Sequence, residues 1–235
     1  MAKRVVITGM GIISPIGNDV PTFWKNLVDG VCGIDYIHDF PTDGLPVKIA
    51  GKIKDFHPEE YGMDKAFGRK QDRFTQYGVA AAYEAMNQAG LVSEGEGQNI
   101  DPFRLGVYVG SGIGGFEIQY RETAKMIEDP TGQWISPLFI PTMISNIAAG
   151  HIAIKHQAKG PCIDVVTACA TSTNNIGEAF RAIRHGYADA IIAGGCEGAT
   201  IPLGIAGFAN AKALSRAEDP KYASLPFNAN RGGFV

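Results

Sequence analysis

Four short apolar runs, each followed by glycine or by a tight turn, constrain the fold of this chain more than any other feature of its sequence. Such runs, rich in β-branched residues and bounded by turn residues, are typical of buried strands. They occupy Arg4–Thr8, Leu105–Val109, Cys162–Thr167 and Ala188–Ala193. Helical patterns separate the runs. Strands that alternate with helices predict an α/β layered domain, with α-β-α layers around a mixed, mostly parallel sheet.

Glycine and proline also mark the ends of the expected helices. Pro21 opens a helix that Gly30 closes, and a longer helix over Arg73–Ala89 ends at Gly90. Three more helices are predicted, over Phe116–Ile127, over Pro141–Ile154, which is rich in small residues, and over Ser172–His185, which Gly186 closes. Residues 31–65 and 129–137 are rich in turn residues, so we expect loops there.

Composition narrows the class of protein. The 235 residues are enough for one large domain or two small ones, and a net charge of −3 does not suggest a nucleic-acid partner. The apolar segments are too short for a signal peptide or a membrane span, so we expect no membrane partner. The four cysteines form no C-x-x-C pair, which favours free thiols in a reducing cytoplasm.

Cys169 lies where a predicted strand turns sharply into a predicted helix. The N-terminus of a helix carries positive partial charge that favours a thiolate, and its free N–H groups can stabilise an oxyanion. Ala168 and Ala170 add little bulk, so an acyl chain can approach. The alternative is a buried structural cysteine, which is the commoner role of an intracellular cysteine. The local pattern alone leaves both interpretations open.

Other local patterns in the sequence give weaker evidence of a functional role. Cys162 and Cys196 lie in and after predicted strands, so a structural role is the better interpretation, and Cys32 carries no local signal. Gly9-Met10-Gly11 lacks the third glycine and the acidic partner of a dinucleotide-binding fingerprint. We therefore expect no cofactor and no metal.

The segment Gly160–Ile176 (GPCIDVVTACATSTNNI) matches the active-site signature of the β-ketoacyl synthases, and the nucleophile of that signature falls on Cys169. The agreement continues along the whole chain, in VVITGMGIISPIG, GSGIGG, ISPLFIPTMISNIAAGHIAI, AGGCEGA and GFANAKALS. The chain thus resembles the elongating type II bacterial β-ketoacyl synthases of the thiolase superfamily. The resemblance implies that residues 1–235 are the N-terminal half of a thiolase-like fold.

In that family the cysteine takes an acyl group from acyl carrier protein as a thioester. Malonyl-carrier protein is then decarboxylated, and the resulting carbanion attacks the thioester to give a 3-oxoacyl product. Covalent capture divides one difficult step into two easier ones. By resemblance, the backbone N–H of Cys169 is one donor of the oxyanion hole, and the partners are acyl and malonyl forms of acyl carrier protein.

The resemblance also implies an acyl pocket and a dimer. Ile113 and Phe208 match residues that border the acyl pocket, although ordinary core packing is the alternative for both. Phe139 and Ile140 match residues that reach towards the acyl pocket of the partner subunit in family dimers. A homodimer is therefore expected from the resemblance.

A small basic cluster lies just before and at the start of the helix over 73–89, and it consists of Lys65, Arg69, Lys70 and Arg73. Acyl carrier proteins are acidic, so such a cluster can steer docking. Arg69 and Lys70 match docking positions of the family, as does Lys212. A second basic pair of the family is replaced here by Gln133-Trp134. The alternative is a solvated surface without a partner.

The sequence also departs from the family. The catalytic histidines of the family lie in an HGT-type and a K-x-x-x-G-H motif, and neither motif occurs in this sequence. Two aspartates of the family's F-D-x-x-R-D-G-F-V stretch are replaced by Asn228 and Gly232. The last residues, 227–235, have the pattern of a new strand, which predicts that the chain is truncated or pairs with another polypeptide.

Two alternative functions remain open. One is a non-catalytic carrier-binding or dimerisation module, and the other is a relative that uses coenzyme A thioesters.

Overall fold

The computed structural model describes residues 3–235, and the chain forms two compact units. Unit 1 consists of Met1–Gly11 and His57–Gly198, and unit 2 of Ile12–Phe56 and Ala199–Val235. Each unit is built from two stretches that are far apart in the sequence. No helix in residues 3–235 has the length and apolar character needed to cross a membrane.

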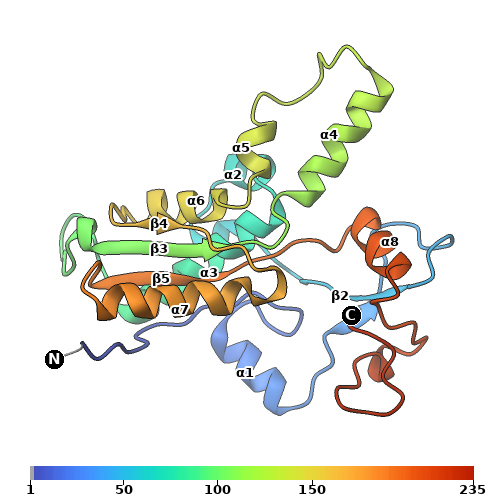
Figure 1. Cartoon of the computed structure of the whole chain (residues 1–235), viewed down its shortest axis with the longest axis horizontal. Coiled ribbons are helices and arrows are strands. Elements are labelled where there is room, and N and C mark those ends of the chain that lie inside the picture. Colours follow the sequence, from blue (N-terminus) through green and yellow to red (C-terminus); the bar gives the residue numbers. More distant parts are fainter. Residues whose placement is uncertain (1–2) are drawn as a thin grey trace. The chain divides into compact units, whose positions relative to one another are not determined.

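Unit 1 is built on a three-stranded parallel sheet with the order β4-β3-β5. Its strands are β3 (Leu105–Gly110), β4 (Cys162–Ile163) and β5 (Ala190–Gly195). The central strand β3 pairs along its whole length with β5 (Figure 1). The parallel sheet predicted from the sequence is thus present in this unit.

Helices cover both faces of this sheet (Figure 1). All six residues of β3 are buried, as expected for a strand with helices on both sides. Tyr108 packs with Ala179 and Ala182 of α7 (Thr171–Arg184). Because side chains alternate along a strand, Val107 and Val109 point to the opposite face. The sheet also contacts α3 (Arg73–Ala89) and α6 (Ile147–Lys155).

The ends of these helices follow the signals in the sequence. Helix α3 runs over the predicted residues; the Asp72 side chain accepts a hydrogen bond from Phe74 N–H, and Gly90 follows with a φ of 62°. Helix α7 is followed by Gly186 with a φ of 85°. The helix predicted over Phe116–Ile127 is α4 (Phe116–Glu128). Residues 129–137 form the expected loop.

The helix predicted over Pro141–Ile154 is wrong as one element. The structure has two helices there, α5 (Phe139–Met143) and α6. Ile144 adopts an extended ψ of 140°, which a continuous helix does not allow.

The strand predicted over Arg4–Thr8 is also wrong. It belongs to no strand in the described residues, and Val6 and Ile7 are 61% and 80% exposed. Gly9 and Gly11 lie so close to α3 that a Cβ atom on either would fall 2.0 Å or 1.9 Å from a backbone oxygen. The segment therefore packs on a helix, but it lacks the strand partner that would satisfy its N–H and C=O groups.

Unit 2 contains α1 (Val20–Val28), a hairpin of β1 (Ile34–Tyr36) with β2 (Ile49–Gly51), and α8 (Pro202–Asn210). Helix α1 confirms the predicted helix between Pro21 and Gly30. The hairpin lies in a stretch predicted to be loop, and α8 was not predicted. The buried core is formed by Ile37, Val47, Ile49, Ala50, Ile205, Ala209, Leu214 and Ala223. Within residues 227–235 the only strand-like feature is one bridge from Phe234 to Leu214.

Candidate active site

Cys169 lies in a 3₁₀ turn, Ala168–Ala170, that leads directly into α7. Ala168 has a φ of 51°, a left-handed conformation that costs a residue with a Cβ on the order of 1–2 kcal/mol. Strained backbone of this kind is concentrated at functional sites. Cys169 is exposed at this turn. The sharp turn expected between strand and helix is therefore present, and the thiol is accessible.

The strand that precedes Cys169 is shorter than predicted, because α7 takes over its backbone groups. Only Cys162 and Ile163 pair in β4. The buried Asn175 side chain accepts a hydrogen bond from Val165 N–H and donates one to Val165 O, both at 3.1 Å. Thr171 Oγ1 accepts a hydrogen bond from Thr167 N–H at 2.9 Å. These side chains hold the segment that leads to Cys169.

Sequence reasoning missed Asn175. Its side chain also donates to Thr171 O at 3.0 Å, so the amide satisfies three backbone groups while it is fully buried. The only signal was a polar residue on the face of α7 that carries the buried Ala179 and Ala182. Buried polar residues of this kind are costly to remove, because their partners are left unsatisfied.

Replacing Asn175 with leucine should lower the free energy of unfolding by about 3 kcal/mol, because Val165 N–H and C=O lose their partners in the interior. Urea denaturation measures the change. The neighbouring Asn174 is exposed and makes one side-chain bond, to Thr167 Oγ1, so Asn174→Leu is the matched control. We expect the control to change stability by less than about 1 kcal/mol. Equal effects of the two substitutions would contradict the role of Asn175.

The glycine-rich segment Gly110–Gly115 lies beside the turn that carries Cys169. A Cβ on Gly112 would be 3.4 Å from Ala168 Cα. Ile113 N–H donates to Glu197 Oε2 at 3.1 Å, and Ser111 Oγ donates to Glu197 Oε1 at 3.3 Å. Burial raises the pKa of the Glu197 carboxyl, and these hydrogen bonds offset only part of the rise. Ile113 itself is 41% exposed, so its side chain is not part of the core of unit 1.

The other three cysteines have different surroundings. Burial raises the pKa of the Cys196 thiol, which donates to Gly110 O at 3.8 Å. Cys162 is exposed on β4, although burial of its sulfur raises its pKa. Cys32 is exposed in unit 2, where its thiol contacts Ile34 O and Pro220 O. Among the four, Cys169 alone lies at the start of a helix.

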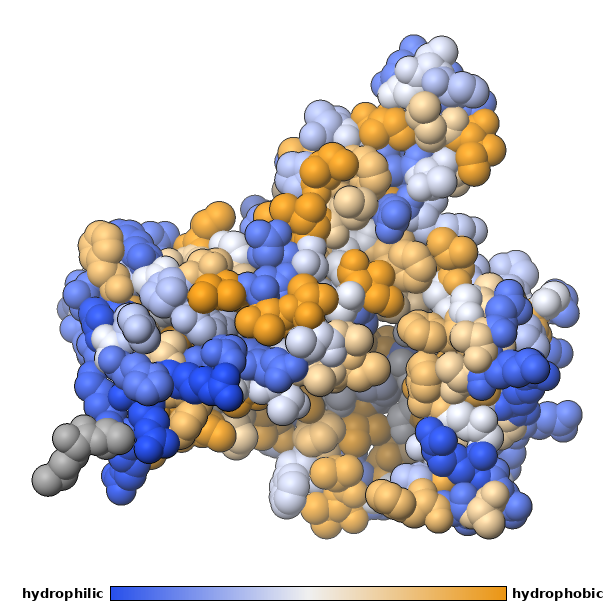
Figure 2. All heavy atoms as spheres, in the orientation of Figure 1, coloured by the Kyte–Doolittle hydropathy of each residue, from blue (hydrophilic) through white to orange (hydrophobic). Residues whose placement is uncertain are grey.

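Phe139 and Ile140 begin α5, the short helix that returns the chain from α4. We call residues 116–143 the α4–α5 segment. Ile140 is 57% exposed, and Figure 2 shows apolar atoms over this segment. Its exposed large apolar side chains are Tyr120, Met126, Ile127, Trp134, Leu138 and Ile140. A monomeric protein seldom exposes so many apolar side chains together, so this segment has the character of an interaction surface.

The predicted docking residues fall in both units. Lys65, Arg69 and Lys70 are exposed on one short helix of unit 1, α2 (Lys65–Lys70). Within residues 3–235, none of the three forms an ion pair. Lys212 is exposed in unit 2 with a φ of 57°. Phe208 also lies in unit 2, 39% exposed, with its ring edge-to-face against Phe234 at a centroid distance of 5.4 Å.

Comparison with known proteins decides the family. Residues 2–235 match the model of the beta-ketoacyl synthase N-terminal domain. The chain belongs to the β-ketoacyl synthase family. It is 46% identical to 3-oxoacyl-(acyl-carrier-protein) synthase 2 of Staphylococcus aureus (strain COL), over 99% of this chain and 55% of that protein. This β-ketoacyl synthase chain thus spans about half the length of the curated relatives it matches.

Solved structures agree with this assignment. A beta-ketoacyl synthase from Burkholderia phymatum STM815 is similar with a TM-score of 0.85 and 28% identity, over 100% of this chain and 56% of that one. A chain of AntDE:AntF, a type II PKS acyl-carrier protein in complex with its ketosynthase, is similar with a TM-score of 0.82 and 26% identity, over 100% and 56% of the two chains. The layered α/β fold predicted for the β-ketoacyl synthase chain is therefore confirmed.

Within unit 1 of this β-ketoacyl synthase, the structure brings together one part of the predicted site. The turn at Cys169 and the segment that carries Ile113 adjoin, through Ala168 and Gly112. Phe139 and Ile140 belong to the same unit, because Gly115 N–H donates to Met143 O at the end of α5. Phe208 and Lys212 belong to unit 2. Their roles remain predictions.

Proposed function

We propose that this chain carries the acyl-accepting nucleophile of a condensing enzyme of fatty acid biosynthesis, and that Cys169 is that nucleophile. One observation carries the proposal: an exposed cysteine follows a left-handed alanine at the entry to a helix, beside a glycine-rich segment. The similarity to 3-oxoacyl-(acyl-carrier-protein) synthase 2 supplies the class of reaction. The cytoplasm is the proposed location, because it keeps the thiol reduced.

In the proposed loading step, the Cys169 thiolate attacks the carbonyl carbon of an acyl-carrier thioester. The tetrahedral intermediate carries a negative oxygen, which the backbone N–H of Cys169 stabilises by a hydrogen bond. The carbon–sulfur bond to the carrier then breaks, and the carrier leaves as its thiol. The acyl group remains on Cys169 as a thioester, held for the second step.

In the second step, malonyl-carrier protein loses CO₂, and its carbanion attacks the carbonyl carbon of the Cys169 thioester. The carbon–sulfur bond to Cys169 then breaks, which releases the Cys169 thiolate and gives a 3-oxoacyl-carrier product. The family uses histidines for this step, in two motifs that this sequence does not contain. We therefore propose that residues 1–235 perform loading alone, and that condensation requires further residues in the same or another chain. Turnover of malonyl-carrier protein by the purified chain would contradict this part of the proposal.

Intact mass spectrometry tests the loading step. The purified chain is incubated with an acyl-carrier thioester and, separately, with the same acyl group on coenzyme A. We expect one acyl group per chain from the carrier substrate, and peptide mapping should locate it at Cys169. No labelling from either substrate would favour a non-catalytic binding module. Efficient labelling from coenzyme A alone would favour a different substrate class.

The proposed partner is acyl carrier protein, and α2 of unit 1 is its proposed docking site. Lys212, in unit 2, is proposed separately as a docking residue from the resemblance. An acidic carrier is attracted to exposed cations that have no internal partner. We expect Arg69→Glu to weaken loading by about tenfold at low salt, because the reversed charge repels the carrier by roughly 1–2 kcal/mol. Measured loading rates should converge with those of the parent chain as salt screens the interaction.

Lys221→Glu is the control for this charge reversal. Lys221 is also exposed and undergoes the same change in charge, but it lies outside the proposed docking residues. If Lys221→Glu lost as much loading as Arg69→Glu, the effect would come from the change in net charge and not from docking at α2.

A homodimer is proposed from the resemblance and from the exposed apolar side chains of the α4–α5 segment. A second copy of this chain is the proposed occupant of that surface. Analytical ultracentrifugation tests the proposal. A monomer at all concentrations would contradict it, and Ile140→Glu should shift a dimer towards monomer because a charge at an apolar contact is unfavourable.

A further inference from the structure

A buried carboxylate in the α4–α5 segment takes no part in the steps above. Glu122 is 1% exposed, and α4 buries just one other side chain, Ile118, which lies four residues earlier on the same face. A glutamate is almost never fully buried unless it is paired. The partners of Glu122 therefore indicate which part of the protein it holds.

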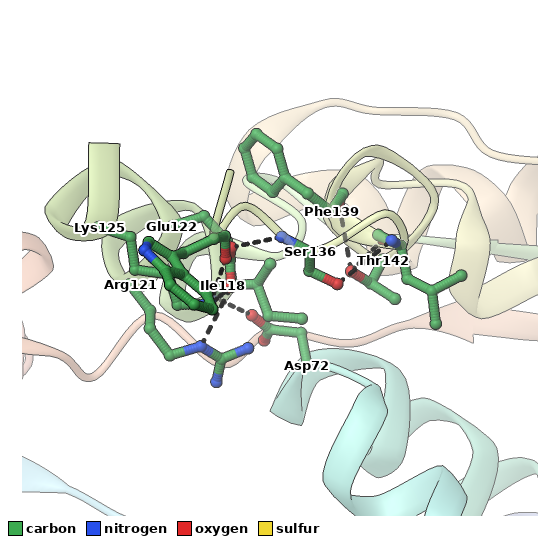
Figure 3. Close-up of polar contacts among 10 residues, drawn as sticks. Asp72, Ile118, Arg121, Glu122, Lys125, Ser136, Phe139 and Thr142 are labelled. Carbon is green, nitrogen blue, oxygen red and sulfur yellow. Dashed lines mark hydrogen bonds and ion pairs between the residues drawn. The ribbon is translucent and has the colours of Figure 1, made fainter. Parts of the chain in front are cut away.

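Both oxygens of the Glu122 carboxylate are occupied (Figure 3). Oε2 accepts a hydrogen bond from Ser136 N–H at 2.9 Å. Oε1 accepts one from Lys125 Nζ at 2.8 Å and lies 3.5 Å from Arg121 Nε. Burial opposes ionisation, but the hydrogen bonds from Lys125 and Ser136 outweigh it and lower the pKa of Glu122. The carboxylate is therefore charged, and its hydrogen bond with Ser136 holds it to the end of the 129–137 loop that leads into α5.

Ser136 lies in the loop three residues before Phe139, the first residue of α5. Its carbonyl oxygen accepts a hydrogen bond from Phe139 N–H at 2.9 Å. At the other end of α5, Met143 O accepts one from Gly115 N–H at 2.8 Å. Phe139 and Ile140 thus lie between two fixed points. One of these points is set by Glu122, and the other by the glycine-rich segment.

The helix that carries Glu122 is itself fixed at its start. Gly115 at the N-cap has no side chain, and the Asp72 carboxylate caps α4 in its place by accepting a hydrogen bond from Ile118 N–H at 2.9 Å (Figure 3). Glu122 follows one turn later. Because the start of α4 is held in place, we expect a displacement of Ser136 to move Phe139, which is hydrogen-bonded to it, and not the start of α4.

We propose that Glu122 is a positioning residue that sets the preference for acyl chain length, by fixing the segment that presents Phe139 and Ile140. The inference rests on the proposed function and on the resemblance, by which those two residues reach towards the acyl pocket of the partner subunit in a dimer. An apolar pocket distinguishes substrates that differ by one methylene by about 10-fold or more, so a small displacement of its wall changes the selectivity.

Glu122→Gln tests the proposal, because it keeps the volume and removes the charge that Lys125 and Arg121 bind. The parent chain and the variant are loaded with butanoyl, octanoyl and hexadecanoyl groups from carrier protein, and the rates are compared. We expect loading of the short chain to stay near that of the parent. The ratio of the long-chain rate to the short-chain rate should change about tenfold. Glu128→Gln, an exposed residue of the same helix, is the matched control and should leave the ratio unchanged.

Lys125→Met provides a second variant, because it removes one partner of the carboxylate and leaves Glu122 in place. If Glu122→Gln does not fold, an altered ratio in Lys125→Met supports the proposal and an unaltered ratio overturns it. Suppose that the parent chain loads all three acyl groups, but the variants keep the same ratio of long-chain to short-chain rates or load every acyl group equally slowly. That result would overturn this inference and leave the proposed function intact. A parent chain that accepts no acyl group would overturn the proposed function and this inference with it.

Discussion

Replacing Cys169 with alanine is expected to abolish acyl loading, with no acyl adduct visible in the intact mass. The reason is chemical, because in the proposed loading step the Cys169 thiolate forms the new bond to the acyl carbon. The substitution removes a single exposed sulfur atom, so the free energy of unfolding should change by less than about 1 kcal/mol. Loss of labelling without loss of stability would separate a chemical role from a structural one.

Cys162→Ala is the matched control for this prediction. Cys162 is also exposed, and it lies in β4 of the same unit. We expect the control to be loaded at the rate of the parent chain. Residual loading of Cys169→Ala on another cysteine, or loss of loading in Cys162→Ala, would contradict the assignment of the nucleophile.

Replacing Gly110 with alanine should lower the free energy of unfolding by about 2–3 kcal/mol, as overpacking of a core does. Gly110 is the last residue of β3, and a Cβ there would be 2.0 Å from Asp164 Oδ1. The same Cβ would be 3.0 Å from Asn175 Nδ2. Asp164 belongs to the segment that leads to Cys169, so we also expect slower loading. Urea denaturation and the loading assay measure the two effects.

Gly194→Ala is the control for the added methyl group. Gly194 lies in the neighbouring strand β5, and a Cβ there would have no other atom within 4 Å, apart from its chain neighbours. The substitution should be neutral or stabilise by up to about 1 kcal/mol, because alanine restricts the unfolded chain. A Gly110→Ala variant as stable as Gly194→Ala would show that the approach of Asp164 to β3 is not as close as the structure indicates.

The sequence predicted the elements whose signals are local. Helix α3 has an apolar periodicity and a terminal glycine, and its predicted bounds are those of the structure. Strand β3 is a continuous apolar run, and it forms the buried centre of a parallel sheet. The run at Arg4–Thr8 has a similar composition, but strand formation depends on a partner, which composition does not reveal.

The residues of the candidate site were also predicted only in part. The sharp turn at Cys169 was predicted from a local pattern, whereas the role of Cys169 came from the resemblance and stays a prediction. Asn175, Glu122 and Asp72 were missed because each acts on the backbone of a residue that is distant in sequence or beyond a loop. For Asn175 and Glu122 the available signal was a polar residue on the buried face of a helix, whereas Asp72 precedes α3 as its N-cap. Only the structure identifies the N–H group that each residue binds.

The shared cap at Asp72 has a consequence for mutational studies of this domain. One carboxylate accepts hydrogen bonds from Phe74 N–H at the start of α3 and from Ile118 N–H at the start of α4. Burial raises its pKa, and these bonds offset part of the rise. The stabilities of the two helix starts are therefore not independent quantities. Free-energy changes from substitutions near the start of α3 and near the start of α4 should not add, even though the two positions are more than forty residues apart.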